Sequence, residues 1–263
     1  MAELAAYLGI GIVVGFLSGL LGIGGGVIIV SALALMFAAH DFPPQYVMHL
    51  SIATSMACIV FGSWSSFRTH HRHDAVDWGV VKGVTPGLIV GVAAGVLVAR
   101  GANTTFLKFF FLGVTLVVTA QMVFNLRPKA ARPLPGRVGL TVFGLIMGVV
   151  ASLFGGGGAA IGVPVLTWCD MTMHRAIGTV AALAFPIAIA GTLGYIAAGW
   201  SVPGLPSWSL GFVYLPAFAG IAATSVVTAR WGARLAHRLK GTTLRRIFAL
   251  VLVSLAVKMA FSV

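Results

Sequence analysis

The chain has 263 residues, of which 59% are hydrophobic and 8% are charged, and its mean hydropathy is +1.03. About a quarter of the residues of a soluble domain are charged, so this composition excludes a soluble globular protein and indicates an integral membrane protein. The apolar runs are continuous rather than alternating, which favours transmembrane helices over a β-barrel. The net charge of +12 is typical of basic cytoplasmic loops, so we expect contact with membrane lipid and none with nucleic acid.

Apolar segments follow one another along the chain on both sides of a basic, proline-rich linker. The segments expected before the linker are 4–21, 24–39, 46–67, 77–99 and 104–125, and those after it are 138–154, 159–169, 175–198, 208–229 and 244–262. The longer ones approach the ~20 apolar residues that a membrane-spanning helix needs. We therefore expect a first transmembrane repeat over 1–126, a cytoplasmic linker over 127–137 and a second transmembrane repeat over 138–263.

The two halves of the chain contain similar motifs in the same order. GFLSGLLGIGGG at 15–26 parallels GVVASLFGGGGA at 148–159, and HLSIAT at 49–54 parallels HRAIGT at 174–179. One constant offset relates Trp78, Pro86 and Arg100 to Trp208, Pro216 and Arg230. Membrane transporters are commonly built from such internal repeats, so the sequence predicts two related halves.

The distribution of basic residues predicts how the chain crosses the membrane. Lys and Arg gather at 68–72, in the linker and at 230–246, whereas 199–207 carries no charge. Because Lys and Arg concentrate on the cytoplasmic side, the three basic regions belong inside and 199–207 outside. Each glycine-containing segment must then return to the side from which it started. The predicted fold is all-α: two inverted repeats, each a broken or re-entrant helical hairpin plus three transmembrane helices, with both termini periplasmic.

The glycine runs at the hairpin turns are the first candidates for a binding site. Residues 159–169 would be about 16 Å long as a helix, half of the hydrocarbon thickness, so the turn before them lies within the membrane. A helix that starts there presents free N–H groups and a positive dipole end, which favour an anion. Alternatively, the glycines only allow close helix packing. The predicted site comprises Gly24, Gly25, Gly26, Gly156, Gly157 and Gly158.

Polar residues at matching positions in the two halves are the second set of candidates. They are His49, Thr54 and Ser55 in the first half and His174 and Thr179 in the second. A histidine in a membrane can donate to an anion or carry a coupling proton, or it lies at the interface as a loop-end residue. The hydroxyls either donate to the substrate or bond back to their own helices. Sodium, bound by free carbonyl groups, is the alternative coupling ion.

Acidic residues are scarce and lie in loops or at span ends. They are Glu3, Asp41, Asp74, Asp77 and Asp170, and we expect Asp170 to pair with Arg175. No span contains the carboxylate pair that acid–base catalysis uses, and the sequence has neither HExxH nor a phosphate-binding GK[ST] loop. We therefore expect a protein that is not an enzyme, with no cofactor, no metal site and a small anionic substrate.

The glycine motif near the N-terminus, its copy GVVASLFGGGGAAIGVP after the linker, and HRAIGTVAA resemble the sulfite exporter TauE/SafE family. The resemblance covers nearly the whole chain and places the family's glycine motifs on 22–26 and 155–158. It implies an inner-membrane secondary transporter of a sulfur-containing anion such as sulfite, a sulfonate or sulfoacetate. An anion channel and a carrier of a non-sulfur organic anion are the alternatives. The sequence indicates neither the direction of transport nor an oligomeric state.

Overall fold

The computed structural model describes residues 2–21, 25–40, 42–123, 133–236 and 241–262. The first half contains α1 (Ala2–Leu21), α2 (Gly26–Ala39), the short 3-10 helix η1 (Pro44–Tyr46), α3 (Val47–Arg72), α4 (Trp78–Gly101) and α5 (Thr104–Val123). The second half contains α6 (Arg137–Phe154), α7 (Ala159–Trp168), α8 (Met173–Gly199), β1 (Ser209–Leu210), β2 (Val213–Tyr214), α9 (Leu215–Ala236) and α10 (Gly241–Ser262).

The all-α prediction is confirmed, and most helices begin within a few residues of the expected positions. Among the described residues, five helical stretches are long and apolar enough to cross a membrane; they lie in α3, α4, α5, α6 and α8. The expected span at 208–229 is wrong in its first turns, because β1 and β2 form a small hairpin and α9 begins only at Leu215. Trp208 and Gly211 have φ values of 70° and 56°, which a helix cannot contain, and Pro216 suits the first turn of α9.

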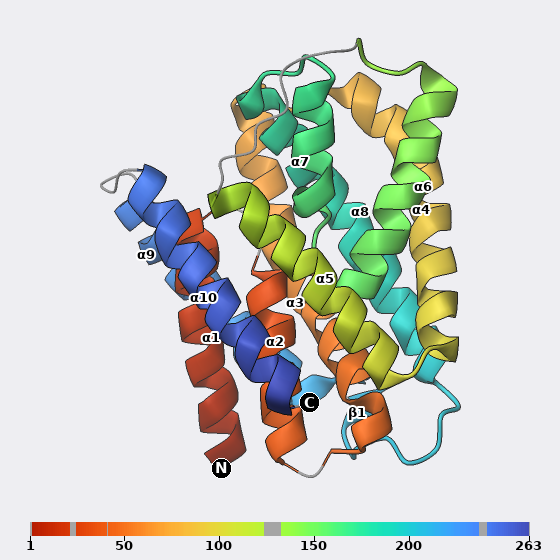
Figure 1. The fold of residues 1–263 in the computed structure, drawn as a ribbon, viewed down its shortest axis with the longest axis vertical. Helices are drawn as coiled ribbons and strands as arrows, with labels where there is room; N and C mark the ends of the chain where they lie inside the picture. The colour runs from red at the N-terminus through yellow and green to blue at the C-terminus, as the bar shows by residue number, and fades with distance from the viewer. Residues whose placement is uncertain (1, 22–24, 41, 124–132, 237–240, 263) are drawn as a thin grey trace.

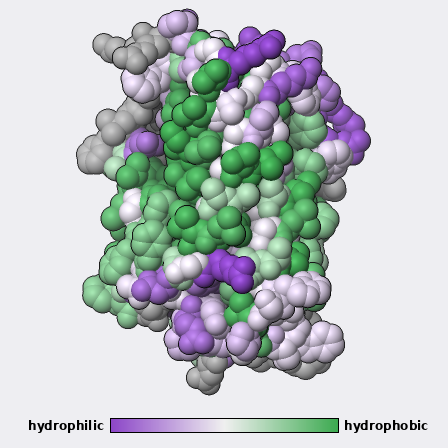
Figure 2. Space-filling model, turned by 90° about the vertical axis from the view of Figure 1, so that its right-hand side faces the viewer, coloured by the Kyte–Doolittle hydropathy of each residue, from purple (hydrophilic) through white to green (hydrophobic). Residues whose placement is uncertain are grey.

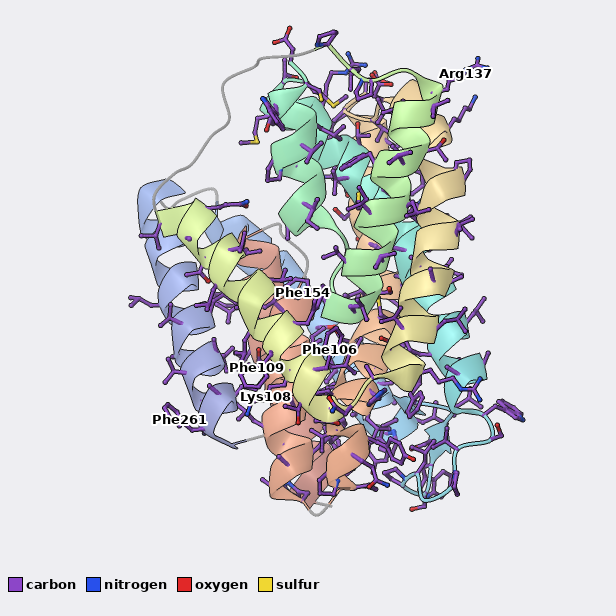
Figure 3. The ribbon with its side chains drawn as sticks, turned by 45° about the vertical axis from the view of Figure 1, so that its right-hand side comes forward. Phe106, Lys108, Phe109, Arg137, Phe154 and Phe261 are labelled. Carbon is purple, nitrogen blue, oxygen red and sulfur yellow. The ribbon has the colours of Figure 1, made fainter. Side chains whose placement is uncertain are left out.

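The two glycine-containing hairpins enter the molecule from opposite ends. In Figure 1, α1 starts at the lower end and α2 returns to it, whereas α6 starts at the upper end and α7 returns there. Figure 3 labels Arg137 at the upper end of α6 and Phe154 at its inner end, well short of the lower end of the molecule. These arrangements agree with the hairpins expected from the charge distribution. The symmetry relation between the halves, and hence the inverted repeat, stays a prediction.

The closest helix pairs combine one helix from each half. α1 packs along α9, α4 packs along α6, and the long helices α3 and α8 lie against each other. Glycines bring the backbones of these pairs into contact: a Cβ on Gly15 would meet the backbone of Ser225, and a Cβ on Gly87 would meet the carbonyl of Thr141. Small residues at a helix interface allow such close approach in membranes. Gly15 and Gly87, which lie outside the glycine runs of the hairpin turns, thus allow close helix packing.

The outer surface fits a lipid environment. Large apolar side chains are exposed along the outward faces of several helices; they include Ile89, Val90, Leu97, Phe109, Leu116, Val117, Val142, Ile146 and Leu250. Figure 2 shows the corresponding hydrophobic band between hydrophilic ends. No Asp, Glu, Lys or Arg is buried among the residues whose side chains the structure describes. The core thus contains apolar and uncharged polar groups, as expected for a multi-pass membrane protein.

Candidate functional site

The two glycine turns meet inside the protein. A Cβ on Gly26, the first residue of α2, would lie 2.7 Å from the carbonyl oxygen of Gly155 and 3.0 Å from the Cα of Gly156. A Cβ on Gly155 would in turn lie 2.7 Å from Val30 of α2. Segments that are distant in the sequence therefore touch through their backbones. The contact requires glycine at 26 because any side chain there would push the second turn away.

Each turn leads into the N-terminus of a helix. α2 starts after Gly25 and α7 starts after Gly158, and neither residue caps its helix with a side-chain hydrogen bond. An α-helix leaves its first N–H groups without intrahelical acceptors, and its N-terminus carries about half a positive charge. Gly155 and Gly158 have φ values of 72° and 75°, a left-handed conformation that glycine adopts without steric cost. Each turn thus leads to a positive helix end: that of α2 lies against Gly155, and α7 begins four residues after Gly155.

Apolar side chains surround the second turn. A Cβ on Gly157 would lie 3.1 Å from Ala184 and 3.9 Å from Ile59, and Gly157 itself is half-buried. Phe154, the last residue of α6, stacks on Phe111 of α5 with ring centroids 5.1 Å apart. The backbone groups of the second turn therefore lie in an apolar environment, where electrostatic attraction is stronger than in water.

Ser55 of α3 connects the two turns. Its buried hydroxyl lies 3.0 Å from the carbonyl oxygen of Gly155 and 3.2 Å from that of Gly26, and it is placed to donate to both. The single hydroxyl proton is therefore directed to the protein in this conformation. Ser55 was expected as a donor to the substrate. The structure places it at the turns and gives it a contact that sequence reasoning did not anticipate.

Thr54 and Thr179 accept hydrogen bonds from distant backbone segments. The hydroxyl oxygen of Thr54 accepts from the N–H of Tyr214 at 3.0 Å, and that of Thr179 accepts from the N–H of Asp77 at 2.9 Å. Both threonines are fully buried. Neither contact is a bond from the threonine back to its own helix, and the hydroxyl of Thr179 also donates to the sulfur of Met171 at 3.9 Å.

The two matching histidines are not brought together. His49 is buried near the start of α3, where its Nε2 lies 2.8 Å from the carbonyl oxygen of Ala99 and its ring stacks on Phe212. Its Nδ1 has no hydrogen-bond partner among the described residues. His174 is exposed at the start of α8, which lies at the opposite end of the molecule (Figure 1). Neither ring is among the contacts of the glycine turns.

The expected pair of Asp170 with Arg175 is wrong. Arg175 instead pairs with Asp77 across 3.0 Å, joining the start of α8 to the start of α4. Asp77 also caps α4 by accepting from the N–H of Val80. Helix α7 ends before Asp170, whose φ of 62° turns the chain toward α8. The capping position of Asp77 before an apolar run was a signal that could have identified its role.

Two further expectations fall on parts of the chain that the structure does not describe. Gly24 lies outside the described residues, so the first turn is represented by Gly25 and Gly26. The linker is described only from residue 133 onward. Among the described residues there is no group of three or more His, Cys, Asp or Glu side chains that could hold a metal ion.

Comparisons with known proteins identify the family. The model of the sulfite exporter TauE/SafE family matches residues 7–259. The chain is 34% identical over 256 residues to a probable membrane transporter protein of Haemophilus influenzae, with 95% of both chains covered. It is 26% identical to the probable membrane transporter protein YdhB of Bacillus subtilis, covering 71% of this chain and 76% of YdhB.

A more distant relative extends the match beyond bacteria. The probable membrane transporter protein MJ0441 of Methanocaldococcus jannaschii is 22% identical, covering 92% of this chain and 90% of its own. No solved structure matches the chain. These relatives carry the names of transporters rather than enzymes. The chain belongs to the sulfite exporter TauE/SafE family and is a multi-pass membrane transporter.

Proposed function

We propose that the protein is a secondary transporter that moves a small sulfur-containing anion, of the sulfite, sulfonate or sulfoacetate type, across the inner membrane by alternating access. The observation that carries this proposal is the contact between the two glycine turns. The N-terminus of α2 lies against Gly155 and Gly156, in the turn that leads into α7.

The chemistry of this region favours an anion over a cation. Each buried helix N-terminus can stabilise a negative charge by up to about 2 kcal/mol, and each N–H that bonds to a charged oxygen adds about 1.5–3 kcal/mol. A sulfite or sulfonate group carries three oxygens, which suits several N–H donors converging from two helices. Within the described part of the chain, no buried carboxylate opposes the anion. The glycines at 25, 26 and 156–158 allow it to approach the backbone.

The proposed orientation places the upper end of Figure 1 in the cytoplasm. Helix α3 ends and helix α6 begins at this upper end. Arg68 and Arg72 lie in the last turns of α3, and Arg137 is the first residue of α6. Helix α1 starts and helix α10 ends toward the other end, where Figure 3 also labels Lys108 and Phe261. By the positive-inside rule, the termini are then periplasmic. The coupling ion in this proposal is a proton or sodium.

Transport in proteoliposomes tests the proposal. We expect saturable uptake and counterflow of labelled sulfite or sulfoacetate, inhibited by related sulfur oxyanions more strongly than by carboxylate analogues. Unitary currents without counterflow would identify a channel, and a preference for carboxylates would identify a carrier of non-sulfur anions. Imposed proton and sodium gradients, applied separately, identify the coupling ion.

A glycine variant tests the site within the same assay. Gly157→Val places a side chain at the half-buried second turn, where even a Cβ would lie 3.1 Å from Ala184. Gly62→Val is the control, since a Cβ there meets nothing within 4 Å. We expect Gly157→Val to abolish uptake while the protein still elutes as a folded species, and Gly62→Val to retain uptake. Normal uptake by both variants would refute a site at the turns.

A further inference from the structure

His49, near the start of α3, uses one ring nitrogen in a hydrogen bond and leaves the other without a partner. Its Nε2 lies 2.8 Å from the carbonyl oxygen of Ala99. A carbonyl oxygen only accepts, so Nε2 carries the proton of the neutral imidazole and Nδ1 presents a lone pair. Backbone groups of Gln45 and Ala102 lie near the ring, but neither bonds to Nδ1. His49 is 3% exposed, and buried polar atoms of this kind normally have a partner.

The surroundings of the ring allow Nδ1 to gain and lose a proton. Ala99 lies in the last turn of α4, whose negative dipole end favours a positive ring. Burial opposes the charge, as does the apolar ring of Phe212, which stacks on the imidazole at 5.1 Å. Gln45, four residues before His49, is exposed, so the ring lies close to the lower end of the molecule in Figure 1. A proton can reach it from that side.

No other described group at this end competes for the proton. No Asp or Glu of the described residues lies within 4 Å of the imidazole. Tyr46 packs edge-on against the ring at 6.1 Å. The other titratable or charged side chains on the elements that meet here are His40, Arg100, Lys108, Tyr195 and Tyr214. His40 and Arg100 are exposed, and Lys108 donates to the carbonyl oxygen of Ala260. Of all these groups, only the imidazoles ordinarily change charge near neutral pH, and His49 is the buried one.

Helix α3 connects His49 to the contact between the glycine turns. Ser55 follows His49 by six residues, about 9 Å along the helix. Its hydroxyl contacts the carbonyl oxygens of Gly26 and Gly155. Closely packed interiors transmit small displacements, so a shift at the start of α3 reaches both turns.

The segment between β1 and β2 connects His49 to the second turn by another route. Phe212, whose ring stacks on His49, donates its N–H to the carbonyl oxygen of Tyr195 at 3.3 Å. The hydroxyl of Tyr195 donates to the carbonyl oxygen of Ser152 at 3.0 Å. Ser152 lies in the last turn of α6, directly before the second turn. The charge of the imidazole can therefore affect the second turn through α8 and α6 as well as through α3.

We infer that His49 carries the coupling proton of the transporter on Nδ1. The inference rests on the proposed function, selects the proton over sodium, and gives no such role to His174, which is exposed. The Nδ1 lone pair takes one proton, the ring becomes an imidazolium, and the Nε2–H stays on Ala99. The new N–H has no acceptor in this conformation, so protonation favours a rearrangement of the start of α3 against α4 and Phe212. His49 does not contact the substrate.

Separate measurements of coupling and exchange in proteoliposomes test the inference. His49→Gln is the informative variant, because its amide can still donate to the carbonyl oxygen of Ala99 but cannot take up a proton. His40→Gln is the control, since His40 is exposed at the end of α2 and bonds to the carbonyl oxygen of Met36. Labelled sulfoacetate is the probe, because neither of its acidic groups titrates between about pH 6 and pH 8.

For one proton moved with each anion, a gradient of about one pH unit changes the steady-state internal concentration of the anion about tenfold. We expect this change in the wild type and in His40→Gln, and none in His49→Gln. Counterflow at equal pH should persist in all three proteins, because exchange needs no net proton movement. A change retained by His49→Gln, or counterflow lost in it, would overturn the inference. Wild-type uptake driven by sodium and not by protons would also overturn it and leave the proposed transport standing.

A second measurement does not depend on transport or on the folding of the variant. NMR of the wild-type protein, with its histidine side chains labelled, follows each ring nitrogen in detergent, and His49→Gln identifies the signals of His49. We expect Nδ1 to become protonated between about pH 8 and pH 5 while Nε2 stays protonated throughout. An Nδ1 that stays unprotonated over this range would overturn the inference. Protonation of Nδ1 in a protein that takes up no sulfoacetate would refute the proposed substrate and leave the proton site standing.

Discussion

The hydroxyl of Ser55 provides the sharpest test of how the two glycine turns are held together. Ser55→Ala removes the donor that lies 3.0 Å from Gly155 O and 3.2 Å from Gly26 O. The carbonyl oxygen of Gly26 belongs to α2, so it can still accept the hydrogen bond that an α-helix forms with the N–H four residues later. Gly155 O loses this buried partner, and an unsatisfied buried acceptor costs about 1–3 kcal/mol. We expect the free energy of unfolding to fall by about 2 kcal/mol, a decrease in Tm of roughly 4–8 °C for a chain of this size.

Thermal unfolding in detergent, followed by tryptophan fluorescence, measures this effect. Ser51→Ala is the matched control, because Ser51 is equally buried on α3 and its hydroxyl bonds to Val47 O one turn earlier. Such bonds within a helix contribute little, so Tm should change by less than about 2 °C. The reasoning fails if Ser55→Ala and Ser51→Ala change Tm equally. Substrate binding should also weaken in Ser55→Ala, since the positions of the two helix ends depend on this contact.

Two further pairs of variants test the packing between helices. Gly87→Ala places a Cβ against the carbonyl of Thr141 and should lower the free energy of unfolding by about 1–3 kcal/mol through overpacking. Gly62→Ala adds a Cβ that meets nothing within 4 Å and should raise the free energy of unfolding by up to about 1 kcal/mol. We expect Tm to fall in the first variant and to rise in the second, and shifts of the same sign would contradict the structure. Asp77→Ala removes both a helix cap and an ion pair and should lower the free energy of unfolding by about 1–2 kcal/mol. Arg175→Ala removes the ion pair alone and should lower it by less than about 0.5 kcal/mol. Thermal unfolding with and without added salt measures both effects.

Periodicity and charge predicted most of the fold because lipid leaves the chain few alternatives. Continuous apolar segments must become helices, and the positions of Lys and Arg then determine which segments return to the same side. This reasoning anticipated that both glycine segments form hairpins. The prediction of a helix was wrong at 208–214, where the chain forms a β-hairpin. The positive φ values of Trp208 and Gly211 do not fit a helix, although the segment is apolar.

Residues of the candidate site were harder to predict because similar residues occupy different environments in the two halves. His49 and His174 match in sequence, yet one is buried beside Ala99 and the other is exposed. Ser55 has no hydroxyl counterpart in the second half, where Val180 follows Thr179. The partners of Thr54 and Thr179 are backbone N–H groups, which every residue except proline carries, so composition gives no indication of them. Only the tertiary arrangement identifies these contacts.

The glycine-lined pairing of α1 with α9 has a consequence for how the protein is made. The ribosome completes α1 first and α9 near the end of synthesis, so α1 enters the bilayer long before its partner exists. Its glycine face, with Gly11 and Gly15, must meanwhile lie against lipid, another helix or an insertion factor. Helix α4 is without its partner for a shorter time, because α6 is synthesised soon after it. Assembly should therefore begin around α4 and α6, and truncated chains that lack α9 should be degraded even though every earlier span is intact.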